Sequence, residues 1–126
     1  MIAEITIPGR PYTKKNSQQI CRRTNGAYFI KQSDTYERYE TEVLWHLKTY
    51  RGPKFDGPVR VTCVYWMPSR QSWPDLMGLY QATADILERA GIIENDRDII
   101  CMNGSRIAGV DAENPRVEIE IEELAK

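Results

Sequence analysis

Alternation of apolar and polar residues predicts β-strands in several parts of the chain. Residues 3–8 place Ile5 and Ile7 on one side and polar residues on the other, and Pro8-Gly9 stops the pattern. Residues 59–67 form the longest β-rich run, and residues 117–121 alternate valine and isoleucine with glutamate. Residues 99–107 are expected to add a further strand.

A β-hairpin is predicted near the N-terminal end. Two short strands, residues 18–22 and 27–30, flank Thr24-Asn25-Gly26, and Asn-Gly is the strongest short signal for a tight hairpin turn. Residues 11–16 before it form a basic loop.

Two segments carry the three- to four-residue spacing of amphipathic helices. Ser33 or Asp34 caps the first, and Asp34 with Glu37 fits a capping box. Its apolar face comprises Tyr36, Tyr39, Val43, Leu47 and Tyr50. The second helix begins near Asp75 and stops at Gly91. Its apolar face comprises Leu76, Leu79, Tyr80, Thr83, Leu87 and Ala90.

The element order βββαβαββ predicts an α+β fold (mixed α/β), with two main helices covering a mixed β-sheet. A chain of 126 residues, 41% hydrophobic and 28% charged, is expected to fold as a single domain over residues 1–126. No apolar run approaches the roughly 20 residues of a membrane span, and residues 1–10 lack a signal-peptide core. We therefore expect a cytoplasmic protein without a membrane partner.

The cysteine pattern argues against zinc and disulfide scaffolds. Cys21, Cys63 and Cys101 are an odd number and lie too far apart in sequence for a metal-binding pair. We expect reduced thiols that pack as small hydrophobic residues. Trp45, Trp66 and the tyrosines of the first helix are also expected in the core.

Charge is distributed unevenly along the chain, although the formal net charge is only -1. Residues 10–54 hold ten basic and four acidic residues, whereas residues 94–126 hold nine acidic and four basic ones. A metal-dependent nuclease could use both, since phosphates need cations and a divalent metal needs carboxylates. The alternative is two solvated faces of a neutral protein.

Three aspartates mark the second helix. Asp75 follows Pro74 at its start, Asp85 lies on its polar side, and Asp96 follows just beyond its end. Each also has a purely structural interpretation. Asp75 can favour the positive end of the helix dipole, Asp85 can lie on a solvated face, and Asp96 can belong to a turn.

The stretch from Pro74-Asp75-Leu76, through Asp85-Ile86-Leu87 and Gly91-Ile92-Ile93, to Asp96 resembles the RusA family of Holliday junction resolvases, common in bacteria and prophages. Residues 7–16 upstream and 104–119 downstream extend the resemblance over nearly the whole chain. It implies a Mg²⁺-dependent endodeoxyribonuclease, with Mn²⁺ as an alternative metal. Such an enzyme would resolve Holliday junctions by paired nicks in DNA recombination and repair, acting on branched DNA as a homodimer without a small-molecule cofactor.

The resemblance implies that Asp75, Asp96 and Asp85 are catalytic and metal-binding, with Glu94 in reserve. Asp75 and Asp85 lie about 15 Å apart along one helix, so they cannot share a metal there, and Asp85 ranks third. Asp96 reaches Asp75 only if the chain after Gly91 runs back along the helix. Otherwise Asp85 lies near Asp96, or the site forms across a dimer.

This chain departs from the family motif at four positions. Met77 stands in place of the second aspartate, Gly78 in place of an asparagine, Gln81 in place of a lysine and Asn95 in place of the first acid of the later pair. One alternative is therefore a catalytically weakened or inactive junction-binding protein of the same fold. Another is a phage accessory protein without a nucleic-acid role.

Basic residues of the N-terminal half are candidates for contacts with the DNA backbone, which need not read bases. The nucleic-acid-binding candidates are Lys14, Lys15, Arg22, Arg23, Arg70 and Arg106. The last two could neutralise the scissile phosphate in place of the missing lysine. Trp73 either stacks on an unpaired base or packs under its own loop.

Overall fold

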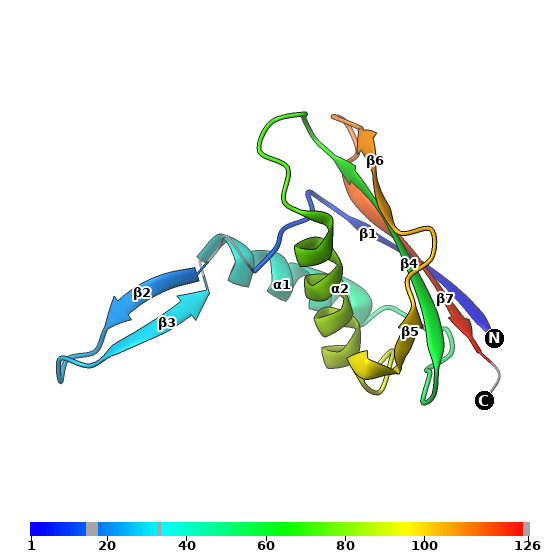
Figure 1. Cartoon of the computed structure of the whole chain (residues 1–126), viewed down its shortest axis with the longest axis horizontal. Coiled ribbons are helices and arrows are strands. Elements are labelled where there is room, and N and C mark those ends of the chain that lie inside the picture. Colours follow the sequence, from blue (N-terminus) through cyan, green and yellow to red (C-terminus); the bar gives the residue numbers. More distant parts are fainter. Residues whose placement is uncertain (15–17, 33, 125–126) are drawn as a thin grey trace.

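The computed structural model describes residues 1–14, 18–32 and 34–124, and its body is a mixed five-stranded β-sheet with two helices (Figure 1). The strands are β1 (Ile2–Pro8), β4 (Val59–Met67), β5 (Ile99–Cys101), β6 (Arg106–Val110) and β7 (Arg116–Glu123). β7 lies between β1 and β4 and is antiparallel to both, whereas β5 and β6 run parallel to β4. The α+β fold with a mixed sheet and two main helices is confirmed.

The prediction of one strand over residues 99–107 is wrong. β5 pairs with the beginning of β4 through Val59 and Ile99, and β6 pairs with its second half. The turn between them places Gly104 at φ 86°, a left-handed conformation that favours glycine. Both short strands pair with β4. The apolar pattern of residues 99–107 does not indicate this pairing with a distant strand.

Both helices cover the same face of the sheet (Figure 1). α1 spans Asp34–Leu47, and α2 spans Leu76–Arg89. Ser33, one of the two predicted caps, lies outside the described residues. The predicted faces are confirmed for Tyr36, Tyr39, Val43, Leu47, Leu79, Tyr80, Thr83 and Leu87, all buried. α1 ends before Tyr50, which is half-buried and donates its hydroxyl hydrogen to the Pro53 carbonyl.

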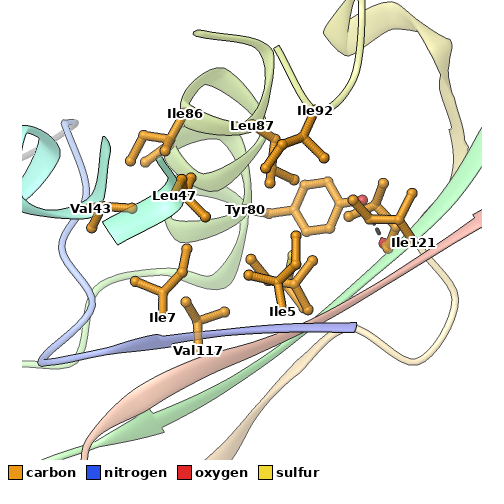
Figure 2. Packing of buried hydrophobic residues seen from close by; sticks show 14 of the residues in the cluster. Ile5, Ile7, Val43, Leu47, Tyr80, Ile86, Leu87, Ile92, Val117 and Ile121 are labelled. Carbon is orange, nitrogen blue, oxygen red and sulfur yellow. Dashed lines mark hydrogen bonds between the residues drawn. The ribbon is translucent and has the colours of Figure 1, made fainter. Parts of the chain in front are cut away.

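The hydrophobic core fills the space between the helices and the sheet (Figure 2). Two tyrosine hydroxyls inside it are hydrogen-bonded: Tyr80 donates to the Val61 carbonyl, and Tyr65 pairs with Thr83, each at 2.7 Å. The expectation that Trp45 and Trp66 belong to the core is wrong. Trp45 is 65% exposed on α1, and Trp66 is half-buried on the other face of the sheet.

That other face of the sheet carries glutamates paired with arginines. Glu118, Glu120 and Glu122 alternate with the buried residues of β7 and therefore point away from the helices. The Arg60 guanidinium donates to Glu120 at 2.6 Å and to Glu122 at 3.0 Å. Arg116 pairs with Glu118 at 3.2 Å. These glutamates therefore form a charged face remote from α2, as in the solvated-face interpretation of the acidic segment.

The predicted hairpin is confirmed, with β2 at Gln18–Arg22 and β3 at Tyr28–Gln32. It extends away from the sheet and helices (Figure 1). Residues 23–27 form its turn, in which the Arg23 N–H donates to the Ala27 carbonyl at 2.7 Å. The hairpin thus places basic residues on an arm.

None of the helices in the described part of the chain is long and apolar enough to cross a membrane.

Buried thiol and phenol groups predict a loss of stability at alkaline pH. Burial raises the pKa of Cys63 from 9.0 to about 12, and it also raises the pKa of Tyr39, Tyr65 and Tyr80 above 10.0. The folded chain holds these protons more tightly than the unfolded chain does. Their contribution to the stability is therefore complete below pH 9 and is lost as pH rises further. Each group lowers the free energy of unfolding by about 1.4 kcal/mol per pH unit between its two pKa values.

Urea unfolding followed by tryptophan fluorescence at pH 8 and pH 10.5 measures this loss. In a Cys63→Ala variant, the part of the stability loss that begins near pH 9 should be absent. Equal stabilities of the parent at both pH values would contradict the prediction.

Candidate functional site

Asp75 caps the N-terminus of α2. Its backbone is extended (φ −72°, ψ 147°), and Oδ2 accepts the Gly78 N–H at 3.0 Å. A carboxylate in this position satisfies a helix N–H that has no partner within the helix, and it is stabilised by the positive end of the helix dipole. Asp75 is nevertheless exposed, so the capping and ligand-binding interpretations are compatible.

A buried threonine that the sequence did not indicate lies against this helix start. Thr13 is only 5% exposed, and its Oγ1 lies 2.7 Å from the point that a Cβ on Gly78 would occupy. Oδ1 of Asp75 lies 3.0 Å from the same point. Thr13 therefore packs directly on the first turn of α2, next to the Asp75 carboxylate. The only hint in the sequence is a glycine in the first turn of a helix.

Gly78→Ala should destabilise the protein by about 1 kcal/mol, although alanine is the better helix former. The new Cβ would press on Thr13 Oγ1 and on the Asp75 carboxylate. Thr13→Ala in the same chain should recover most of the loss, which thermal unfolding of both single variants and the double variant would measure. Additive effects would mean that Thr13 does not limit space at Gly78.

Asp85 lies in a network of ion pairs in the second half of α2, about one turn before the helix ends. The Lys14 ammonium lies 2.7 Å from its carboxylate, and Arg89 Nε lies 3.3 Å away. Arg89 also pairs with Glu40 of α1 at 2.8 Å. Beneath this network, burial and then the neighbouring Glu40 raise the pKa of Tyr36. The network joins Lys14 to both helices, and Lys14 and Arg89 compensate the charge of Asp85.

Asp96 lies at the other end of α2, as the first residue of the short 3₁₀ helix η1 (Asp96–Asp98). Its backbone N–H donates to Glu88 Oε1 at 2.8 Å. Asn95 caps η1 by accepting the Arg97 N–H at 3.0 Å. Glu88 follows Asp75 by thirteen residues, about 20 Å along the helix. Asp96 and Asp75 therefore lie at opposite ends of α2.

The chain beyond Gly91 does not run back along α2 to Asp75. Ile93 bridges to Phe55, and β5 then pairs with the start of β4. Glu94, the reserve acid, lines a groove of about 460 Å³ that also borders Glu88. Glu94 therefore belongs to the same end of α2 as Asp96.

The three aspartates thus occupy the start, the second half and the region beyond the end of one helix. Among residues 1–14, 18–32 and 34–124, no group of three or more His, Cys, Asp or Glu side chains could hold a metal ion. Within that part of the chain, Asp75, Asp85 and Asp96 therefore lie at separate points along α2 rather than in one cluster.

The candidate cations are distributed over the loops and the hairpin. Arg23 is exposed at the hairpin turn, and Arg70 is exposed in the loop before α2. Arg106 is exposed and donates to the Gly104 carbonyl at 2.8 Å. Lys15 lies outside the described residues, and Arg22 is placed in β2 without a description of its side chain. These arginines lie on separate segments rather than in one cluster.

The positions where the chain departs from the motif lie on the same helix or near it. Gln81 and Met77 are exposed on α2, and Met77 is 63% exposed beside Asp75. No acidic or basic group replaces the missing ones at these two positions.

The family model described as "RusA: Endodeoxyribonuclease RusA" matches residues 8–122, which include Asp75, Asp85 and Asp96. No curated protein sequence matches the chain.

Proposed function

Because this chain belongs to the RusA family of endodeoxyribonucleases, which act on branched DNA, we propose that it resolves four-way junctions by paired nicks. The proposed cofactor is Mg²⁺, with Mn²⁺ as an alternative, and the proposed context is DNA recombination and repair. The observation that carries the proposal is the exposed Asp75 carboxylate at the start of α2, within the matched residues.

Asp75 is suited to holding a hard cation in a fixed position. The Gly78 N–H orients its carboxylate, and Thr13 packs against the same turn. A divalent metal bound there would make a water nucleophilic and offset charge on the phosphoryl oxygens. We also assign Arg70, exposed five residues before Asp75, to a neighbouring phosphate.

A second copy of the chain would complete the site. Mg²⁺ commonly binds one or two carboxylates plus water and phosphate. Two copies related by a twofold axis could bring Asp75 of one chain beside Asp96 of the other, since these acids lie at opposite ends of α2. Such a homodimer has two equivalent sites, as two nicks in a four-way junction require. In this arrangement Glu88 orients the segment that carries Asp96.

Asp85 keeps a third place in this proposal. Its carboxylate is already held by Lys14 and Arg89, so a metal would have to displace a cation. The same ion pair makes Lys14 a weaker candidate for phosphate contact than the exposed Arg70.

The second candidate function is junction binding without efficient cleavage. Met77 and Gln81 offer an apolar and a neutral side chain where the family motif has an acid and a base. A labelled four-way junction incubated with Mg²⁺, with Mn²⁺ and with EDTA separates the two functions. Metal-dependent paired nicks support resolution, whereas specific binding without nicks supports the binding protein. An absence of both would support an accessory protein without a nucleic-acid role.

The salt dependence of junction binding should report the phosphate contacts. The logarithm of affinity falls with the logarithm of salt concentration by about 0.9 per neutralised phosphate. Replacing Arg23 and Arg70 together with alanine should reduce this slope by about two. Arg51→Ala is a matched control, because Arg51 is exposed and donates to the Lys48 and Tyr50 carbonyls just after α1. Equal slopes for the double variant and the parent would remove both arginines from the DNA contact.

A further inference from the structure

An aromatic ring lies exposed two residues before Asp75. Trp73 is 38% exposed at the end of the loop over residues 68–75, and Met77 is 63% exposed two residues after Asp75. The Asp75 carboxylate is thus flanked in sequence by two large apolar side chains in contact with solvent. Trp73 thus packs against its loop in part and remains 38% exposed.

The loop holds the Trp73 ring in place. The indole Nε1–H donates to the Ser69 carbonyl, which closes the loop on itself. Ser72, directly before Trp73, has φ 57°, a left-handed conformation that is uncommon for residues other than glycine. A ring that is already oriented loses little conformational entropy when a ligand stacks on it.

We propose that Trp73, with Met77 on the other side of Asp75 in sequence, stacks on an unpaired nucleobase at the branch point and so favours branched over linear DNA. The inference rests on the proposed function, since it takes the scissile phosphate to lie at Asp75. Stacking on an aromatic ring needs an exposed base face and tolerates any sequence. Bases inside a linear duplex are stacked on each other, whereas a branch point can offer an unstacked one.

The charges around the loop fit the same occupant. Arg70 is exposed in the loop and can bind the phosphate of the stacked nucleotide. Trp45 is more exposed than Trp73, but the Lys48 ammonium covers its ring at 4.1 Å from the centroid. Trp45 therefore provides a matched control with an equal side chain in a different setting.

The test compares binding to a four-way junction and to a linear duplex of the same sequence, in EDTA so that cleavage does not interfere. Trp73→Ala should weaken junction binding about tenfold and leave duplex binding within about twofold. Trp73→Phe keeps an aromatic face and should lie between the parent and Trp73→Ala. Trp45→Ala should change neither affinity. Thermal unfolding of each variant checks that it is folded.

A direct readout places the fluorescent base 2-aminopurine at the branch point. In the parent, stacking on Trp73 should quench its fluorescence. In the Trp73→Ala variant, the fluorescence should be restored. Equal losses for junction and duplex, or no loss at all, would overturn the proposal. Mg²⁺-dependent junction cleavage by the parent is measured in parallel. If the parent cleaves the junction but Trp73→Ala keeps the parental preference for junction over duplex, the stacking proposal alone is wrong. If the parent does not cleave, the result counts against the proposed nuclease function.

Discussion

Asp75→Asn should reduce junction cleavage by at least about 100-fold and leave the protein folded and able to bind the junction. Asparagine caps helices as well as aspartate does, so it can still accept the Gly78 N–H. What it loses is the negative charge that a divalent cation requires. The free energy of unfolding should therefore stay within about 0.5 kcal/mol of the parent value.

Two further variants separate charge from capping. Asp75→Ala removes the cap as well and should lower the free energy of unfolding by about 1 kcal/mol. Glu113→Gln removes an exposed carboxylate from the turn before β7 and should leave cleavage unchanged. Single-turnover cleavage of a labelled junction and urea unfolding measure both properties. If Asp75→Asn cut at the parental rate, Asp75 would act only as a cap.

Local sequence patterns predicted the elements that local chemistry determines. β4 has the predicted bounds, because an alternating run between Pro58 and Pro68 leaves little freedom at either end. The start of α2 could also be predicted from the sequence. Pro74 disfavours a helical conformation in the residue before it, and Asp75 is a good N-cap.

Contacts between segments far apart in sequence could not be predicted from local patterns. Residues 99–107 divide into two strands because both pair with β4, and nothing in their own pattern records that partner. Trp45 occupies a position next to the apolar face of α1, but Lys48 offers its ring an exposed cation–π contact.

In the candidate site, too, local features could be predicted from the sequence and contacts between distant segments could not. The motif indicated three aspartates, and helix geometry alone separated Asp75 from Asp85. The sequence did not show that Lys14, 71 residues earlier, binds Asp85, or that Thr13 packs on Gly78. It also left open whether Asp96 returns to Asp75. In the structure the chain leads from α2 to Phe55 and then to β4, so that Asp96 stays at the far end of the helix.

The second large effect is expected from mixed dimers. If each site combines Asp75 of one chain with Asp96 of the other, Asp75→Asn and Asp96→Asn proteins should both be inactive alone and regain activity when mixed. In the mixed dimer one site contains both substitutions, and the other contains neither. Random mixing should restore about a quarter of the parental nicking, as single-strand nicks rather than complete resolution. Asp96→Asn keeps the backbone N–H that binds Glu88, so the segment should remain folded.

A chain carrying both substitutions gives the opposite result and therefore serves as the matched control. Paired with a parental chain, it leaves no intact site if the two acids act across the dimer, but one intact site if they act within a chain. Affinity tags of different kinds isolate each mixed dimer, and sedimentation should give twice the 14.6 kDa of one chain. Nicking by the parental–double dimer together with silence of the single-variant mixture would place Asp75 and Asp96 in one chain. Because the two acids lie about 20 Å apart along α2, that outcome would require η1 to leave Glu88 and move along the helix when DNA binds.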